Sequence, residues 1–443
     1  MSTTRIRALV AFLAFVLSAS ASAQGGPAGK PNVVLIITDD VGYGDLGSYG
    51  ATDVRTPHID RLAREGTRFT DFYAAPTCSP TRASLITGRY YQRVKIERPM
   101  AGPRTADGER GLPVTGRSLP QLLKNNGYAT GLVGKWHLGY KREFGPNAHG
   151  FDWFWGFLSG YVDYYQHTDG GGAHDLFENG TPTHAEGYLT DLITERALKF
   201  LDERSGGPFF LEVAFNAAHW PFQVPDKPSV APGNARFVQP QEDGTSTRQD
   251  YVAILERADQ GIGRILDALD RKGLARNTLV IYTQDNGGEW LSRNTPFFHR
   301  KDTIWEGGVR VPLIARWPAH IPSRRTTPQV GITMDLTATI LAATGSPVPA
   351  DARFDGIDLL PVLSGKTAPA ERTLFFRNTV PNQRVQRAVR RGDWKVLADG
   401  PNVMVFNVRE DPGERNDLAR ARQDIARQLR PLIAEWEKDV DGP

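Results

Sequence analysis

The sequence predicts an α/β protein: a large, mainly parallel sheet sandwiched by helices, followed by a small antiparallel sheet with one helix. The first part is predicted because short, nearly continuous apolar runs alternate with helical patterns, as in parallel sheets covered on both sides. The second part is predicted because this alternation stops near residue 365, where short strands separated by turns take over. We therefore expect a main domain over residues 31–365 and a smaller one over residues 366–443.

Four apolar runs are expected to form buried strands of the main sheet: Asn32–Thr38, Tyr128–Val133, Phe209–Phe215 and Leu279–Thr283. Their length and nearly continuous apolar character are typical of strands buried on both faces. Helices are expected between them, at Pro57–Glu65, Ser118–Asn125, Tyr188–Arg204 and Arg248–Lys272. Ligands of such sheets bind beyond the carboxyl ends of the strands, so the polar residues that follow these four runs should converge on one site.

The smaller domain is expected to contain four short strands and a final helix. The strands are predicted at Arg372–Phe376, Val385–Arg390, Trp394–Leu397 and Met404–Val408. The helix is predicted at about Ala421–Lys438. Strands joined by such short turns are typical of an antiparallel sheet, which we expect to pack on the main domain.

The N-terminus has the three parts of a secretory signal. Arg5 and Arg7 precede an apolar run over residues 8–17, and a small-residue cleavage site ending at Ala23 follows. An apolar run of about 10 residues is too short to cross a bilayer, which takes about 20. We expect a signal peptide over residues 1–23, and a mature protein that is exported to the periplasm or medium without a membrane span.

Composition excludes one class of partner and singles out one residue. The formal net charge is +3 at pH 7 and the chain has no run of five like charges, so it lacks the charge pattern of a nucleic-acid-binding protein. Cys78 is the only cysteine, so no internal disulfide can form. Exported proteins usually carry disulfides, and a lone thiol in an oxidising compartment calls for a chemical explanation.

A helix is expected to begin at the segment Cys78-Ser79-Pro80-Thr81-Arg82. Ser79 is a good capping residue and Pro80 suits the first turn, which places Cys78 at the helix N-terminus. Free amide groups there favour an anion. Arg82 lies one helical turn after Cys78, so its guanidinium can reach the reacting group at residue 78 or nearby aspartates. Taken alone, a small buried thiol would be the simpler interpretation.

Two segments of the chain resemble motifs of the type I sulfatases. Cys78–Arg82, followed by Thr87-Gly88, matches the signature Cys-x-Pro-x-Arg with its Thr-Gly. Gly127–His137 matches Gly-Tyr-x-Thr-x-x-x-Gly-Lys-x-His. The likeness extends from Asn32 to the C-terminal sheet and includes Asp285-Asn286-Gly287 and Trp305-Glu306-Gly307-Gly308. It implies the fold of the alkaline phosphatase superfamily and the hydrolysis of sulfate monoesters to an alcohol and sulfate.

The resemblance also implies why the chain has one cysteine. In the family a dedicated formylglycine-generating or sulfatase-maturating enzyme oxidises this cysteine to formylglycine (3-oxoalanine), so Cys78 would be a precursor. The aldehyde would hydrate to a gem-diol; one hydroxyl would attack sulfur as the alcohol leaves, which gives a sulfated hemiacetal. The second hydroxyl would then lose its proton, so that the carbonyl re-forms and sulfate is expelled. The implied substrate is a sulfated small molecule or glycan.

Four oxygen-bearing residues follow two of the predicted strands: Asp39, Asp40, Asp285 and Asn286. Sets of ligands made only of oxygen suit hard cations such as Ca²⁺ or Mg²⁺. The resemblance implies one Ca²⁺ ion, with modified Cys78 as a further ligand. Such an ion would lower the pKa of a diol hydroxyl and shield a sulfate oxygen.

The resemblance assigns roles to four further basic residues. Lys135 and His137, two residues apart after a strand, would face the same site, Lys135 toward the sulfate and the leaving oxygen and His137 toward the diol. His219 resembles the histidine that protonates the leaving group. Lys301 resembles the sulfate-binding lysine, although the usual glycines on its two sides are replaced.

Several alternatives stay open at this stage. Some phosphonate and phosphodiester hydrolases share this fold and can carry the same modified cysteine, and a catalytically silent binder of sulfated glycans is a third hypothesis. The aromatic loop at residues 163–167 either packs as an ordinary loop or contacts substrate. Four arginines form either a solvated strand face or a surface that steers a sulfated polymer: Arg384, Arg387, Arg390 and Arg391.

Overall fold

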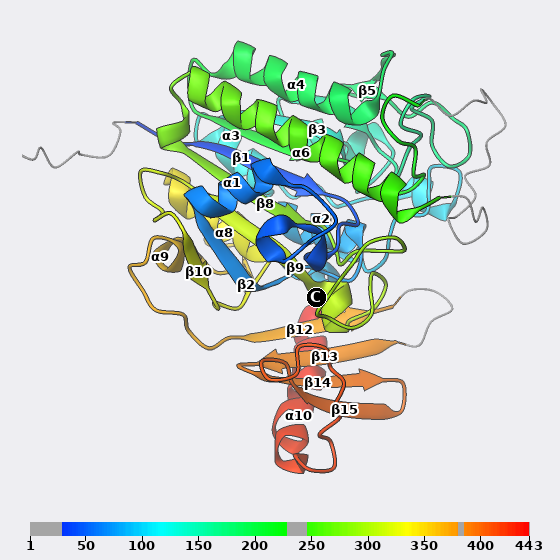
Figure 1. Ribbon diagram of the computed structural model, residues 1–443, viewed down its shortest axis with the longest axis vertical. Helices are drawn as coiled ribbons and strands as arrows, with labels where there is room; N and C mark the ends of the chain where they lie inside the picture. Colours follow the sequence, from blue (N-terminus) through cyan, green and yellow to red (C-terminus); the bar gives the residue numbers. More distant parts are fainter. Residues whose placement is uncertain (1–28, 228–245, 380–384, 443) are drawn as a thin grey trace, which may run out of the picture.

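The computed structural model describes residues 29–227, 246–379 and 385–442. The expected signal peptide and Arg384 lie outside these ranges. In the described residues the main body is an eleven-stranded sheet with helices on both faces, and a separate four-stranded sheet follows it (Figure 1).

The four predicted strands form the centre of the large sheet and run parallel in the order β8-β1-β7-β3. They are β1 (Asn32–Thr38), β3 (Ala129–Lys135), β7 (Phe209–Ala214) and β8 (Thr278–Gln284). The full order is β10-β2-β9-β8-β1-β7-β3-β4-β5-β6, with β11 also paired to β2. The additional strands are β2 (Thr67–Tyr73), β4 (Trp153–Phe157), β5 (Phe177–Glu178), β6 (Thr181–Pro182), β9 (Arg310–Arg316), β10 (Arg325–Thr327) and β11 (Gly331–Ile332).

The sheet is mixed because β9 runs antiparallel to both β8 and β2. The sequence pattern did not indicate β9, whose Pro312 cannot donate a backbone hydrogen bond and is unusual in a central strand. It did not indicate β2 either, since TRFTDFY carries polar residues at several positions.

Helices cover both faces of the large sheet, and alternate side chains of β1 contact the two layers. Val34 and Ile36 belong to the core formed with α1 (Pro57–Glu65), α4 (Leu189–Arg204) and α6 (Arg248–Arg271). Val33, Leu35 and Ile37 belong to the core formed with α2 (Cys78–Thr87), α3 (Leu119–Asn125) and α8 (Met334–Thr344). This two-sided burial is the reason why the strand sequences are continuously apolar. Among the described residues the main body also contains two one-turn helices, α7 (Glu306–Val309) and α9 (Leu360–Leu363).

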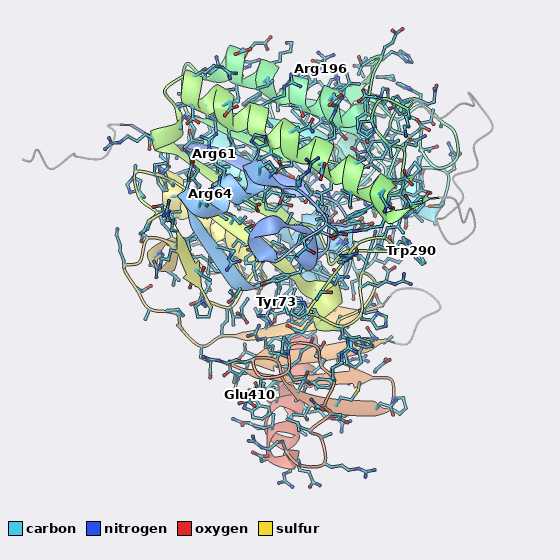
Figure 2. The ribbon with its side chains drawn as sticks, in the orientation of Figure 1. Arg61, Arg64, Tyr73, Arg196, Trp290 and Glu410 are labelled. Carbon is cyan, nitrogen blue, oxygen red and sulfur yellow. The ribbon has the colours of Figure 1, made fainter. Side chains whose placement is uncertain are left out.

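The C-terminal sheet is antiparallel, in the order β12-β13-β14-β15. Its elements are β12 (Thr373–Asn378), β13 (Gln386–Arg391), β14 (Trp394–Asp399), β15 (Asn402–Asn407) and the helix α10 (Gln423–Asp441). One face packs on α10 through Val389, Val396 and Val405. The other face packs on the main body, where Tyr73 marks the boundary between the two sheets in Figure 2.

Of the arginines expected to form a basic face on β13, Arg390 does not reach a free surface. Arg390 is buried and donates hydrogen bonds to the Asp71 carboxylate and the Tyr73 hydroxyl of the main body. Arg387 pairs with Glu437 of α10. Both alternatives for Arg390, a solvated residue or one that steers a polymer, are therefore wrong. In the described ranges we find no helix with the length and apolar character that crossing a bilayer requires.

Candidate active site

The polar residues that follow β1, β3, β7 and β8 lie together at one edge of the large sheet. Backbone hydrogen bonds join the loops after β1 and β7: the Asp39 N–H donates to Ala217 O (2.9 Å), and the Ala218 N–H donates to Asp39 O (2.7 Å). All the residues proposed from the sequence for the site are buried: Asp39, Asp40, Cys78, Arg82, Lys135, His137, His219, Asp285, Asn286 and Lys301.

Positive side chains bridge the carboxylates of this cluster. Lys135 Nζ lies 2.5 Å from Asp39 Oδ2 and 3.8 Å from Asp285 Oδ2. Arg82 donates to Asp285 Oδ2 (2.9 Å) and to the Lys135 carbonyl oxygen (3.1 Å). On the other side of the cluster, Asn286 Nδ2 donates to Asp40 Oδ1 (2.7 Å). The loops after β1, β3 and β8 and helix α2 are thus joined in one buried polar network.

Three oxygens in this network are buried without a hydrogen-bond partner among the described residues: Asp39 Oδ1, Asp285 Oδ1 and Asn286 Oδ1. A buried acceptor without a partner costs about 1–3 kcal/mol, so three together need an explanation. Burial, and then the neighbouring Asp285 charge, raise the pKa of Asp39, although Lys135 acts in the opposite direction. Oxygen acceptors in a buried, mutually repelling set fit a hard divalent cation.

A second set of candidate ligands overlaps the first. Asp39, Asp40 and His219 each place one ligand atom within 4.8 Å of the others. However, the Lys301 ammonium lies 3.4 Å from His219 Nε2, where it can donate a hydrogen bond to that nitrogen. Because His219 Nε2 is engaged in this way and three oxygens lack partners, we favour the oxygen set as the cation site.

Cys78 is the first residue of α2 and its side chain lines the cavity described below. The residue is 2% exposed, and burial raises the pKa of its thiol to about 11. The capping tendency of Ser79 suggested that it precedes the helix, but the residue before the helix is Thr77. Ser79 lies inside the first turn, where Oγ donates to His137 O (2.9 Å) and accepts from the Met100 N–H (3.1 Å). It joins the start of α2 to two other walls of the cavity.

His137 and His219 each have one ring nitrogen held by a backbone carbonyl. His137 Nε2 lies 3.0 Å from Met100 O, and its buried Nδ1 has no partner among the described residues. His219 Nδ1 lies 2.6 Å from Trp220 O. Burial lowers the pKa of both, that of His219 to about 3, so both rings are neutral at pH 7 in this structure. A neutral ring must donate its proton to the carbonyl, which leaves Nδ1 of His137 and Nε2 of His219 as acceptors.

Lys301 lies between the loop after β1, which carries Asp40, and the loop after β8, which carries Glu289. Its Nζ is 2.8 Å from Asp40 Oδ2 and 3.4 Å from Glu289 Oε2. Burial by itself would raise the pKa of Asp40, but Lys301, His219 and Lys135 together outweigh burial and the pKa falls. The changed residues beside Lys301 therefore do not prevent its ammonium from reaching the site.

The aromatic loop at residues 163–167 packs against the site rather than lining its cavity. The Tyr164 hydroxyl donates to the carbonyl oxygens of Asn216 (3.2 Å) and His219 (2.9 Å). Asp163 accepts from the Gln223 amide at 2.6 Å. Among the described residues this loop thus holds the segment that carries His219, and the packing alternative holds for it.

A cavity of about 500 Å³ opens onto the cluster. Cys78, His137, His219 and Lys301 line it together with residues that the sequence did not indicate: Arg104, Tyr161, Asp169, Trp220 and Glu289. Tyr161 follows β4, and recognising WFWGF as a strand would have placed this loop at the same edge of the sheet. Arg104 carries no such signal, because it lies in an irregular stretch between α2 and α3.

The chain is similar to known sulfatases in sequence and in structure. A family model described as Sulfatase matches residues 31–346, and one described as N-sulphoglucosamine sulphohydrolase, C-terminal, matches residues 295–439. N-acetylgalactosamine-6-sulfatase of Rattus norvegicus is 37% identical over 99% of this chain and 91% of that protein. Arylsulfatase G of Homo sapiens is 32% identical over 93% of this chain and 87% of that protein. The crystal structure of Ps i-CgsB in complex with k-i-k-neocarrahexaose has a TM-score of 0.82 and 29% identity, covering 93% of each chain.

Proposed function

The chain belongs to the sulfatase family and hydrolyses sulfate esters, and we propose that it acts on sulfated carbohydrates with formylglycine at position 78 and one calcium ion. One observation carries the proposal. Three buried oxygens without hydrogen-bond partners among the described residues belong to the same network that surrounds the single cysteine of the chain. A cation and a modified residue account for both features.

Asp39, Asp40, Asp285 and Asn286 would hold the ion together with the matured side chain of residue 78. When bound, the ion supplies positive charge that shields a sulfate oxygen and lowers the pKa of a hydroxyl. Calcium is favoured over magnesium because it accepts irregular sets of six to eight oxygens, whereas magnesium requires a near-ideal octahedron.

Cys78 is poorly suited to act as a thiol. With its pKa raised to about 11, the thiol is protonated at neutral pH and a weak nucleophile. Formylglycine supplies a hydrated aldehyde whose hydroxyl can attack sulfur. The chain contributes the placement: α2 begins at residue 78 on the cavity wall, and Arg82, one turn later, is fixed by Asp285.

The lysines of the site would stabilise negative charge, and its histidines would transfer protons. Lys135 and Lys301 keep their charges at neutral pH. Burial would lower both pKa values, but the neighbouring acidic groups, led by Asp39 for Lys135 and by Asp40 for Lys301, together outweigh burial and raise them. They are placed to stabilise the sulfate and the charge that grows on the leaving oxygen. His219 Nε2 faces Lys301 and is an acceptor in this structure, so it must take up a proton before it can pass one to the leaving group. Nδ1 of His137 has no hydrogen-bond partner among the described residues and would accept a proton from the hydrated residue 78.

Carbohydrate is proposed as the alcohol from the relatives and from the cavity wall. The rat relative is named for an N-acetylgalactosamine sulfate, and the Ps i-CgsB structure contains an oligosaccharide. In this chain the rings of Tyr161 and Trp220 lie on the cavity wall with their centroids 4.1 Å apart. Together they form an aromatic surface of the kind against which sugar rings pack.

Biogenesis completes the proposal. A signal peptide over residues 1–23, cleaved near Ala23, would export the chain to the periplasm or medium, and a formylglycine-generating or sulfatase-maturating enzyme would modify Cys78. These steps are testable together, because the secreted protein should begin near Gln24 and lack a free thiol.

The test is a screen of sulfated mono- and oligosaccharides against the matured enzyme, with free sulfate as the readout. Nitrophenyl sulfate and a nitrophenyl phosphate diester are assayed in parallel, since they share a leaving group and differ in the group that is attacked. We expect sulfate release from at least one sugar sulfate at a higher kcat/KM than for nitrophenyl sulfate. Faster hydrolysis of the phosphate diester, or release only from the aryl ester, contradicts the proposed substrate class.

A further inference from the structure

We propose that Arg104 forms a second anion-binding subsite in the cavity, which favours sulfated sugars whose neighbouring residue carries another anionic group. The inference rests on the proposed carbohydrate substrate. It assigns a function to a residue that belongs to neither family motif and that lines the same cavity as Cys78 and Lys301.

The segment that carries Arg104 is fixed to the reacting end of the cavity. Four residues earlier, the Met100 N–H donates to Ser79 Oγ in the first turn of α2 (3.1 Å). The Met100 carbonyl oxygen is 3.0 Å from His137 Nε2 and accepts from the Tyr140 hydroxyl at the same distance. Arg104 therefore has a defined position relative to residue 78.

A buried carboxylate orients the guanidinium of Arg104. Nη2 donates to both oxygens of Asp169, at 2.9 and 3.0 Å, while the Arg104 side chain stays 54% exposed and that of Asp169 only 6%. Asp169 Oδ1 also accepts from the backbone N–H groups of Gly171 and Ala173, each at 2.9 Å. The loop is thus closed by backbone donors whether or not the arginine is present, so the arginine is not required to form it.

The rest of the guanidinium is available to a ligand. Nε and Nη1 of Arg104 make no hydrogen bond to the described residues, and together they carry three N–H donors. Donors in this planar arrangement match carboxylate and sulfate oxygens, to which arginine binds through two parallel hydrogen bonds. A neutral neighbouring sugar would leave these donors hydrated at no cost, so the subsite adds preference without excluding uncharged substrates.

The wall between the two ends of the cavity suits a sugar ring. The Tyr161 ring stacks on that of His219, with centroids 5.5 Å apart and planes 10° from parallel. The loop approaches both Tyr161 and Arg104 closely because it contains glycines: a Cβ on Gly170 would lie 2.2 Å from Tyr161 Oη, and one on Gly171 would lie 1.7 Å from Arg104 Nη2. With sulfate at Lys301 and its sugar along Tyr161, the next residue of the glycan comes to Arg104.

The anionic group can be a uronic acid carboxylate or a second sulfate ester, and the experiment separates the two. Three disaccharides share one sulfated terminal sugar and carry a neutral sugar, a uronic acid or a second sulfated sugar beside it. Sulfate release from the terminal sugar gives kcat/KM for each, and the readout is the ratio of each charged substrate to the neutral one. The variants are Arg104→Gln, Arg104→Lys and the control Arg110→Gln.

Arg110 matches Arg104 in charge, in its exposed fraction of 48% and in its pairing with a buried aspartate, Asp107, but does not line the cavity. We expect Arg104→Gln to lower the ratio about tenfold to a hundredfold for at least one charged substrate, as the loss of a charge-assisted hydrogen bond implies. Arg104→Lys should retain part of the preference, and Arg110→Gln should retain all of it.

An unchanged ratio in Arg104→Gln, or equal losses on all three substrates with a lower Tm, would mean that the arginine only supports the loop and would overturn the subsite. If the variant fails to fold, the wild-type ratio is measured at rising ionic strength, where the subsite requires it to fall and a constant ratio contradicts it. The proposed function is judged separately: no sulfate release from the neutral disaccharide or from nitrophenyl sulfate would overturn that function and the subsite with it.

Discussion

Glu306 joins the two sheets of the molecule, and replacing it tests how the C-terminal sheet is held. The side chain is fully buried and accepts hydrogen bonds from Lys395 Nζ of β14 (2.9 Å), Arg310 Nη1 (3.1 Å) and the Tyr73 hydroxyl (2.6 Å). Lys395 lies equally close to Glu414, at 2.9 Å. The family motif that contains Glu306 therefore has a structural role at this boundary.

The lowered pKa of Glu306 gives the size of its contribution to the free energy of unfolding. Burial alone would raise this pKa, but Lys395, Arg310, Arg390 and the Tyr73 hydrogen bond together outweigh burial and lower it from 4.5 to about 2. The difference corresponds to about 3 kcal/mol of free energy of unfolding. Because the pKa is lowered in the folded state, this stability is present above pH 4.5 and is lost as the pH falls toward 2.

We therefore expect Glu306→Gln to lower the free energy of unfolding by about 3 kcal/mol at pH 7, and Tm by roughly 3 °C. At pH 3 the loss should be less than half as large, since wild-type Glu306 then stabilises less. Thermal unfolding followed by tryptophan fluorescence measures both, with the exposed Glu435→Gln on α10 as the control. An equal loss at the two pH values, or none at pH 7, would refute the reasoning.

Three further perturbations test other parts of the account. Burial raises the pKa of Glu212 to about 7, so its protonated form stabilises the fold below pH 4.5, and this stability is lost as the pH rises through 7. Glu212→Gln should therefore raise the free energy of unfolding by up to about 3 kcal/mol at pH 8 and by much less at pH 5. An equal gain at the two pH values would contradict this. Removal of Ca²⁺ by chelation, or Asp285→Ala, should lower both turnover and Tm, and unchanged turnover in protein shown by elemental analysis to be metal-free would reject the cation site. His219→Ala should slow a sugar sulfate about 10²–10⁴-fold but nitrophenyl sulfate much less, whereas Lys135→Ala should slow both; equal slowing by His219→Ala, with chemistry rate-limiting, rules out His219 as the acid.

The central strands could be predicted because burial on both faces leaves a direct mark on the sequence. Val33 to Ile37 alternate between two helix layers, so every position is apolar. The edge of the sheet at which their polar residues meet follows from parallel pairing. β2 and β9 carry no such mark, since β2 includes polar residues and β9 contains Pro312.

The walls of the site could not be predicted in the same way, because tertiary contacts alone place them. Arg104 lies in an irregular segment whose position is set by the contact of Met100 with Ser79. Arg390 has the sequence pattern of a surface strand, yet the docking of the C-terminal sheet buries it against Asp71. The pattern of apolar and polar residues in a segment indicates which side chains its own helix or strand buries. It does not indicate which side chains become buried when a sheet from another part of the chain packs against them.

The central claim is that Cys78 is the precursor of the reacting group, and the most direct measurement compares its chemical state with activity. Because the chain has one cysteine, thiol titration and intact mass both report on this position alone. Preparations made with increasing amounts of the maturation enzyme should show turnover of a sulfate ester that rises in proportion to the fraction of protein carrying the aldehyde. Protein in which every molecule retains the Cys78 thiol should release no sulfate, and full turnover by such protein would contradict the account.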